Sequence, residues 1–169
     1  MMKDARFDTG PVMAGTGLAL RQEALDDLPF LELLFISTRL AELEPTGWPA
    51  EMKHQFLASQ FGFQRRHYAQ AYHDADFCIV QQDDRPVGRL YLFRGTADIR
   101  IVDISLLPEW RGRGFGAALI AAVQAEAERS GCSVSLQVAL HNPAQRLYTR
   151  LGFVQTGTDG ASWSMRWPA

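Results

Sequence analysis

One stretch in the second half of the chain constrains the fold more than any other. Residues 99–106 read IRIVDISL, which is typical of a buried strand, and Pro108 follows it and ends the pairing. The sequence then runs EWRGRGFG, and apolar residues recur at helical spacing over about 114–130 until Gly131. We therefore expect a strand, a glycine-rich turn and an amphipathic helix in direct succession.

Such a turn is suited to binding anions. The first N–H groups of a helix have no intrahelical acceptor, and the helix dipole adds about half a positive charge at that end. Gly112, Gly114 and Gly116 allow a phosphate to approach the main chain without meeting a Cβ atom. Arg111 and Arg113 add mobile positive charge at the rim. The pattern predicts a cradle for a di- or polyphosphate.

Other phosphate-binding motifs fit the turn less well. A Walker loop requires Gly-Lys followed by Ser or Thr, which this stretch lacks. A dinucleotide fold requires an acidic residue about 20 residues further on, outside the helix. Here the nearby Glu126 and Glu128 lie inside the predicted helix. A glycine-rich connector with incidental arginines is the remaining alternative if this segment is taken alone.

The other elements complete a mixed α/β pattern. A hairpin is expected around the turn DDRP at 83–86. The other predicted strands and helices are strands at 18–21, 77–80, 87–93, 133–139, 153–156 and 162–167, and helices at about 27–43, 50–72 and 142–151. This order predicts a mixed sheet of about seven strands with helices on both faces. We expect one domain at 16–169 after a flexible tail at 1–15.

Composition limits the classes of function. The 169 residues carry a formal net charge of −2, so no global positive field exists to collect nucleic acid. The sequence contains no run of 18 apolar residues, so no membrane span is predicted. Cys78 and Cys132 are too few for a disulfide framework and, like the histidines, lack metal-ligand spacing, so no metal is expected. We interpret both cysteines as small buried hydrophobes and expect a cytoplasmic protein.

A second motif, VALHNPAQRLYTRLGF at 138–153, follows the next strand. Asn142 and Pro143 start a helix and Gly152 ends it. With both motifs in this order, the chain resembles the GNAT-type N-acetyltransferases over about 77–169. The family pattern is Arg/Gln-x-x-Gly-x-Gly/Ala after a strand, then Asn…Ala-x-x-Leu-Tyr…Leu-Gly-Phe. The matching residues are Arg111 to Gly116 for the first motif, and Asn142, Ala144, Leu147, Tyr148 and Leu151-Gly152-Phe153 for the second.

One departure from the family pattern concerns the asparagine. In many relatives it lies seven residues before the tyrosine, whereas Asn142 lies six before Tyr148 and His141 holds the seventh place. We keep Asn142 as the expected cofactor contact because its capping role has a clear physical basis.

The resemblance implies that acetyl-CoA lies where the fourth and fifth strands splay apart, between 99–106 and 133–139. The pantetheine arm would pair with the main chain like an added strand, and the pyrophosphate would lie on the turn. The implied cofactor-binding residues are Ile104, Ser105, Leu106, Arg111, Gly112, Arg113, Gly114, Phe115, Gly116, Ala117, Asn142 and Tyr148. The implied activity is transfer of an acetyl group to a primary amine of a small molecule or peptide.

The resemblance also suggests how direct transfer from the thioester would be assisted. An amine with a pKa near 10.4 costs roughly 4.6 kcal/mol to deprotonate at pH 7, so a base is useful. Asp103 is our first candidate, ahead of Glu109 and Glu44, and the alternative is an ion pair with Arg100 or another sheet residue. The Leu106 N–H could polarise the thioester carbonyl.

Tyr148 is the candidate acid that protonates the leaving thiolate. Its position on the apolar stripe of its helix also fits a core tyrosine, but the family match favours the acid. The aromatic-rich helix over 50–72 is interpreted as core, or else as an apolar wall of the acceptor pocket. Glu42, Glu44 and Trp48 lie where relatives shape the acceptor site, and a solvated loop is the alternative.

Two competing functions remain at this stage. One is a non-catalytic acyl-CoA-binding or sensor module on the same fold, against which Tyr148 argues. The other is a nucleic-acid or protein adaptor whose binding surface contains Arg111, Arg113, Arg146 and Arg150. The formal net charge of −2 argues against this adaptor. The sequence identifies neither the acceptor amine nor the oligomeric state, for which a homodimer is one candidate.

Overall fold

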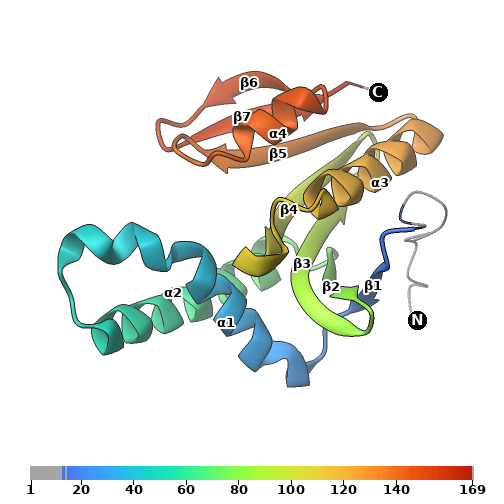
Figure 1. Ribbon diagram of the computed structural model, residues 1–169. Coiled ribbons are helices and arrows are strands. Elements are labelled where there is room, and N and C mark those ends of the chain that lie inside the picture. The colour runs from blue at the N-terminus through green and yellow to red at the C-terminus, as the bar shows by residue number, and fades with distance from the viewer. Residues whose placement is uncertain (1–12, 14, 169) are drawn as a thin grey trace.

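The computed structural model describes Met13 and residues 15–168 (Figure 1). Within these residues the strands form one sheet of order β1-β2-β3-β4-β5-β7-β6. Its strands are β1 (Leu18–Gln22), β2 (Asp76–Gln82), β3 (Arg85–Arg94), β4 (Asp98–Leu106), β5 (Ser133–Ala139), β6 (Val154–Thr158) and β7 (Ser162–Trp167). Neighbouring strands are antiparallel except for β4 and β5, which are parallel. The predicted mixed sheet is therefore confirmed.

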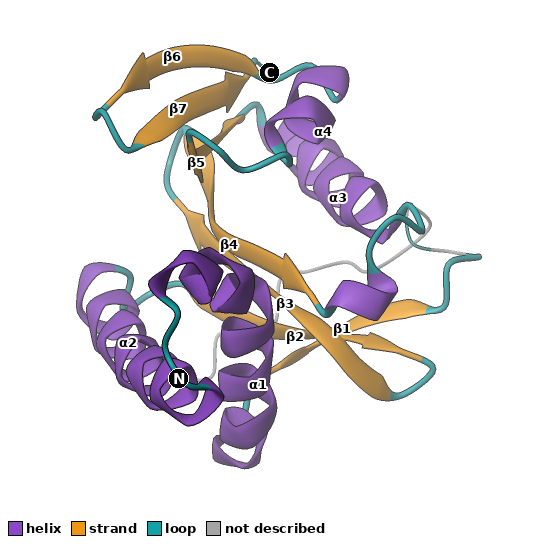
Figure 2. Cartoon of the chain, turned by 60° about the vertical axis from the view of Figure 1, so that its left-hand side comes forward, coloured by secondary structure: helices purple, strands orange, loops and turns teal. Residues whose placement is uncertain are grey.

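Helices cover both faces of this sheet (Figure 2). They are α1 (Leu28–Arg39), α2 (Ala50–Ala71), α3 (Phe115–Ser130) and α4 (Gln145–Arg150). Side chains of a strand alternate between faces, and neighbouring residues of β2 show this clearly. Ile79 is buried with the α1 and α2 side chains, whereas Val80 is buried with those of α3 and α4. The α1–α2 pair and the α3–α4 pair thus pack on opposite faces.

Two predicted helices are shorter than expected. The helix predicted over 27–43 stays α-helical only to Arg39 and continues as a 3-10 helix over Leu40–Thr46. Pro45 accounts for this, because its ring excludes the α-helical hydrogen bond to the residue four positions earlier. The helix predicted over 142–151 begins at Gln145, since Asn142 and the residues after it form a turn.

The apolar side chains of α1 and α2 differ in how far they are buried. Leu31, Leu34 and Phe35 of α1 are buried. In α2, Leu57 and Phe61 are buried, but the second apolar row remains exposed. The exposed fractions in that row are 48% for Met52, 39% for Phe56 and 58% for Phe63. The interpretation of α2 as core is therefore correct for one side of the helix and wrong for the other.

Several expectations concern the chain as a whole. The predicted tail over 1–15 lies mostly outside the described residues, although Met13 is buried in the main core. Cys78 and Cys132 are free and buried, as predicted. Over the described part of the chain, no helix is long and apolar enough to span a membrane. Nor does any group of three His, Cys, Asp or Glu side chains gather there as metal ligands.

Candidate active site

The two parallel strands separate halfway along their length. β4 and β5 pair from Asp98 opposite Ser133 to Ile101 opposite Leu136, and no pairing continues beyond that point. A β-bulge at Val102 lies where the pairing stops, because the register of β3 against β4 shifts there. Bulges bend the strand that carries them and increase its twist. The splay expected between the fourth and fifth strands is therefore present, and a bulge accounts for it.

The separation leaves main-chain groups of β4 without a strand partner. In an antiparallel pair, alternate residues direct N–H and C=O toward the neighbouring strand. Because the Leu107 N–H bonds to the Val87 carbonyl, the register directs the polar groups of Ile104 and Leu106 away from β3. Arg111 Nε donates to the Leu106 carbonyl at 2.9 Å. The main chain of Ile104 and the Leu106 N–H remain directed toward the opening.

The glycine-rich turn lies directly after this edge of β4. Gly112 and Gly114 have φ of 70° and 82°, a region that side chains rarely adopt. A Cβ atom at either position would meet nothing within 4 Å, so the space beside the main chain is open. The first hydrogen bond of α3 is donated by Ala118 to the Gly114 carbonyl. The N–H groups of 115–117 precede that bond and have no acceptor within the helix.

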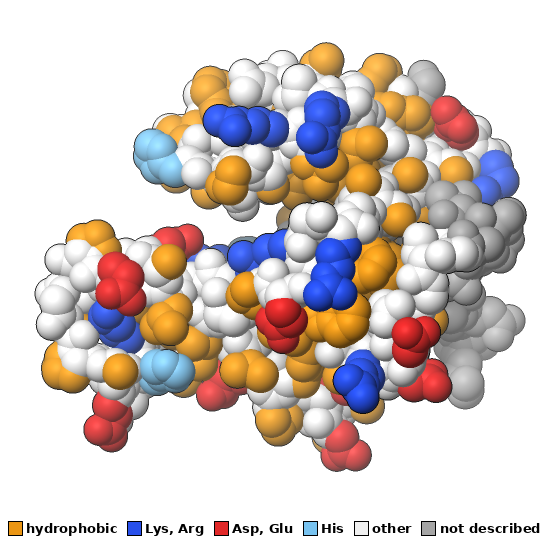
Figure 3. Space-filling view, in the orientation of Figure 1, with side chains coloured by type: hydrophobic (Ala, Val, Ile, Leu, Met, Phe, Trp, Pro, Cys, Tyr) orange, Lys and Arg blue, Asp and Glu red, His pale blue; other side chains and the backbone are white. Residues whose placement is uncertain are grey.

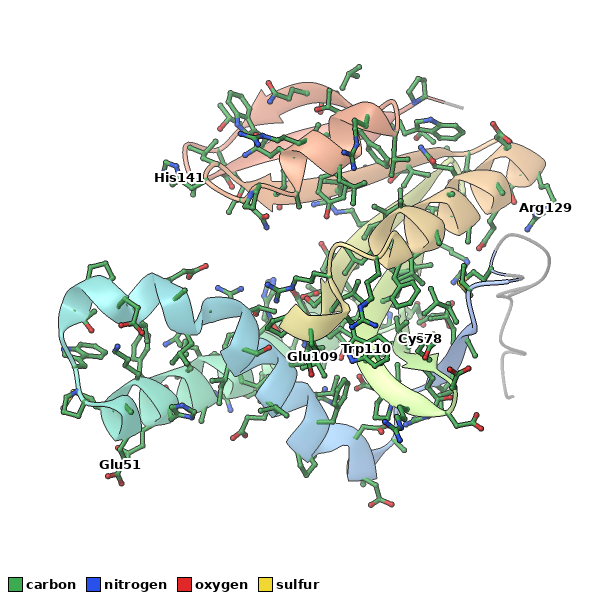
Figure 4. The ribbon with its side chains drawn as sticks, viewed as in Figure 1. Glu51, Cys78, Glu109, Trp110, Arg129 and His141 are labelled. Atoms are coloured by element: carbon green, nitrogen blue, oxygen red, sulfur yellow. The ribbon has the colours of Figure 1, made fainter. Side chains whose placement is uncertain are left out.

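Aromatic side chains shape the outer surface of the turn. The Arg113 guanidinium lies 4.8 Å from the centre of the Trp110 ring, and Trp110 stacks on Phe115 at 6.0 Å. Figure 4 shows Glu109 and Trp110 beside the short helical turn that precedes α3. Arg111 is held against the end of β4, whereas Arg113 is an exposed cation at the rim. The turn thus combines free amides with positive charge.

Tyr148 of α4 lies on the other side of the opening. Its side chain is buried and its ring packs 5.9 Å from Phe153. Burial, and then the nearby Asp103 carboxylate, raise the pKa of Tyr148 to about 12. The Tyr148 hydroxyl bonds to no described residue, yet it is not among the buried polar atoms without a partner. The hydroxyl is therefore a protonated donor directed into accessible space.

Asp103 of β4 is held by three donors. Its Oδ2 accepts from Arg89 Nη2 at 2.7 Å and from the Tyr68 hydroxyl at 2.9 Å. Its Oδ1 accepts from the Ser105 hydroxyl at 2.7 Å. Because each carboxylate oxygen accepts about two hydrogen bonds, Oδ2 is saturated and Oδ1 retains one free position. The ion pair considered with Arg100 is formed with Arg89 instead.

Arg89 is a functional candidate that the sequence reasoning missed. Its side chain is almost completely buried, and its Nη2 also donates to Gln64 Oε1 at 2.7 Å. Its Nε and Nη1 are buried without a hydrogen-bond partner. The available signal was a charged residue inside the otherwise apolar run VGRLYLF at 87–93. A buried charge in a strand requires a partner, and the partner is Asp103.

The remaining sequence candidates lie further from this centre. Glu44 pairs with Lys53 at 3.1 Å, which engages its carboxylate, and Glu109 is exposed. Asn142 Oδ1 accepts the Ala144 N–H at 2.9 Å, so its side chain stabilises a local turn. His141 is exposed at the outer end of the lobe formed by β5, β6, β7 and α4 (Figure 4). The Asn142 N–H also donates to the carbonyl of Ala139, the last residue of β5, at 3.0 Å.

A wide notch opens beside these groups. Figure 3 shows it between the lobe formed by β5, β6, β7 and α4 and the part formed by α1 and α2, with Lys and Arg side chains on both sides. A cavity of about 380 Å³ lies between the end of α1, the following 3-10 helix and α2. Gln64, which bonds Arg89, is part of its lining. The site therefore has an anion cradle, a buried acid and carboxylate, and a separate pocket.

Sequence comparisons point to one family. The model of the acetyltransferase (GNAT) family matches residues 36–153. A curated relative from Bacillus subtilis strain 168, described as a putative ribosomal protein alanine N-acetyltransferase, is 31% identical over 85 residues. That match spans 49% of this chain and 56% of the relative. The chain thus matches little more than half the length of that relative.

Solved structures share the fold. The N-acetyltransferase PaiA from Thermoplasma acidophilum, in complex with coenzyme A, superposes with a TM-score of 0.67 at 17% identity, covering 90% of this chain and 99% of that one. A chimera of the spermidine N-acetyltransferase SpeG from Vibrio cholerae and hSSAT gives a TM-score of 0.62 at 23% identity, covering 90% of this chain and 95% of that one. At these identities the likeness concerns the architecture alone.

Proposed function

The chain belongs to the acetyltransferase (GNAT) family, and we propose on this premise that it transfers the acetyl group of acetyl-CoA to a primary amine. The observation that carries the proposal is the separation of β4 and β5 after the Ile101–Leu136 pair. Fully paired strands would leave no main chain for an extended ligand to bind. Here such main chain lies directly before a turn suited to phosphates.

The residues present fit coenzyme A. The main chain of Ile104 and the Leu106 N–H would pair with the pantetheine amides in the manner of an added strand. The N–H groups over 112–117 would hold the pyrophosphate, because a Cβ atom is absent where it must approach. Arg111 and Arg113 would supply positive charge, with Arg111 also fixing the end of β4. We keep Asn142 as a proposed contact through the second lone pair of its main-chain carbonyl, since its side chain is engaged in the turn and its N–H donates to Ala139.

Tyr148 is the acid in the proposed reaction. The amine nitrogen bonds to the thioester carbonyl carbon, the carbon–sulfur bond breaks, and the sulfur leaves with its electron pair. The Tyr148 hydroxyl donates a proton to that sulfur and regains one from the acceptor nitrogen or water. The raised pKa keeps the Tyr148 hydroxyl protonated throughout the neutral range, so the proton is present when the sulfur leaves. The Leu106 N–H would polarise the carbonyl oxygen.

Asp103 is the proposed site that receives the acceptor amine. The free position on its Oδ1 can accept a hydrogen bond from an ammonium group, while Arg89, Tyr68 and Ser105 fix the carboxylate. A fixed anion attracts the ammonium form and gives its proton a path toward water. We propose that Asp103 orients the amine and assists its deprotonation.

The test of this proposal is thiol release. Purified protein with acetyl-CoA and a panel of primary amines should release one thiol for each amine acetylated. Stabilisation by acetyl-CoA without thiol release for any amine would favour the acyl-CoA sensor instead. We propose the cytoplasm as the compartment, supported by two free, buried cysteines.

A further inference from the structure

The cavity beside α2 has a distinct chemical character. Half of its ten lining residues are apolar: Phe35, Leu43, Phe56, Leu57 and Phe63. Phe56 and Phe63 belong to the exposed row of α2 that the core does not cover. A volume of about 380 Å³ falls within the range of pockets that bind small molecules. The wall suits an apolar body the size of an aromatic or branched side chain.

One cation in this pocket is not neutralised by the protein. The Arg39 guanidinium lies 4.6 Å from the centre of the Phe35 ring. Among the described residues it forms no ion pair, whereas the nearby Glu44 is paired with Lys53. Arg39 therefore offers an oriented, planar donor to an anion that enters the pocket.

The pocket adjoins the proposed catalytic centre through a chain of contacts. Gln64 lines the pocket and accepts from Arg89, which in turn bonds Asp103 at 2.7 Å. Arg39 lines the same pocket as Gln64, and the charges of Asp103, Arg89 and Arg39 all influence the pKa of the Tyr68 hydroxyl. Two buried nitrogens of Arg89, Nε and Nη1, also have no acceptor among the described residues. The Arg39 and Arg89 guanidinium groups therefore lie on the same side of the site as the Asp103 carboxylate, and Glu42 adds a second carboxylate in the pocket lining.

We infer that the acceptor is an α-amino carboxylate with a bulky apolar side chain. This inference rests on the proposed acetyl transfer and specifies its acceptor. Its ammonium group would lie at Asp103, its carboxylate at Arg39, and its side chain against Phe35, Phe56 and Phe63. In an amino acid the ammonium and carboxylate are joined through one carbon, so a carboxylate held at Arg39 would keep the nitrogen in the pocket from which Gln64 and Arg89 lead to Asp103. In this arrangement the acceptor's carboxylate, bound at Arg39, would position the acceptor's amine nitrogen.

The same charges disfavour a polyamine. A polycationic acceptor would bring additional positive charges toward Arg39 and Arg89, and Glu42 is the one carboxylate in the pocket lining. Like charges brought together in a partly enclosed site repel strongly. This chain should therefore acetylate spermidine poorly, even though a protein with the same fold is a spermidine acetyltransferase.

The experiment compares four acceptors that differ in charge. L-Phenylalanine, phenethylamine, L-phenylalaninamide and spermidine are assayed for thiol release with acetyl-CoA. We expect kcat/KM for L-phenylalanine to exceed that for phenethylamine by about tenfold, the effect of one charged hydrogen-bonded contact. Arg39→Gln should remove that preference, so that the ratio of the two kcat/KM values measured on the variant falls to about one. Arg66→Gln is the matched control, because Arg66 stacks on Phe63 at 4.7 Å but does not line the pocket.

A binding measurement separates this inference from the proposed function. L-Phenylalanine should raise the melting temperature of the protein saturated with CoA, and Arg39→Gln should abolish that rise while Arg66→Gln keeps it. A preference for phenethylamine or spermidine, or an unchanged Arg39→Gln variant, would overturn the inference while acetyl transfer stands. If no amine releases thiol, acetyl transfer fails, and the melting shift alone decides whether the pocket binds amino carboxylates.

Discussion

Asp103 and Arg89 form a buried ion pair of 2.7 Å between β4 and β3, close to the point where β4 leaves β5. The exposed fractions of the two side chains are 12% and 3%. Asp103 belongs to the part of β4 that borders the opening, and Arg89 holds it from β3 on the other side of β4, so the pair contributes both to the stability of the fold and to the geometry of the site. Its removal should therefore affect both.

The change Asp103→Asn should destabilise the protein strongly. It leaves the Arg89 charge buried without its counter-ion, and such a loss costs about 3 to 5 kcal/mol. Urea unfolding at pH 7 measures the effect. The matched control is Arg166→Gln, whose ion pair with Asp98 is longer and whose side chain is 52% exposed, so we expect less than about 1 kcal/mol. Equal losses in the two variants would contradict a structural role for the Asp103–Arg89 pair.

Gly114→Ala tests the phosphate cradle. The φ of 82° strains an alanine by about 1 kcal/mol or more, and the new methyl group enters the open space beside the turn. Gly131→Ala is the matched control at the other end of α3, with φ of 65° and equally open surroundings. Both variants should lose similar stability, but calorimetric titration should show weaker CoA binding in Gly114→Ala alone. Equal CoA affinity in both variants would remove this turn from the binding site.

Tyr148→Phe tests the acid. The hydroxyl bonds to no described residue, so its loss should cost little stability, while kcat for acetyl transfer should fall by about a hundredfold, as is typical of a lost general acid. CoA affinity should change little. Stopped-assay thiol release and calorimetric titration measure the two quantities. An unchanged kcat would mean that the thiolate leaves without help from Tyr148.

Stability should decline at alkaline pH in a defined order. Burial raises the pKa of Cys78 from 9.0 to about 11, and burial also raises that of Tyr148 to about 12. A raised pKa means that the folded state holds the proton more tightly, so its contribution is complete below the ordinary pKa and is lost as pH rises toward the folded value. The free energy of unfolding should therefore begin to fall above pH 9.

The variant Cys78→Ala isolates the first part of that decline. Between pH 9 and 10 the slope of unfolding free energy against pH should be shallower in Cys78→Ala than in the unaltered protein. Urea unfolding at several pH values gives both slopes. Identical slopes would show that the Cys78 thiol does not contribute.

The sequence predicted the elements that carry strong local signals. Hydrophobic runs, the DDRP turn and the glycines that end α3 and α4 are local, so the seven-stranded sheet and its helices followed from them. The opening between β4 and β5 was expected only through the family resemblance. Its physical cause, the bulge at Val102, depends on the register of β3 against β4, which no local pattern reveals.

The partners of charged residues were less predictable. Asp103 was expected to pair with a sheet residue such as Arg100, but strand alternation and register bring Arg89 and Tyr68 to it instead. The exposed row of α2 was interpreted as core because its spacing is helical and apolar. Whether such a row is covered depends on which helix packs against it, and α1 covers only the Leu57–Phe61 side.

The most direct test of the account is thermal unfolding with acetyl-CoA, CoA and ATP, each at about a hundred times the dissociation constant measured for acetyl-CoA. The central claim is that the separated ends of β4 and β5, with the turn at Gly112 and Gly114, hold the pantetheine and pyrophosphate together. It predicts that acetyl-CoA and CoA each add about 2.7 kcal/mol of stability, with a far smaller effect of ATP. Stabilisation by ATP but not by CoA would contradict it.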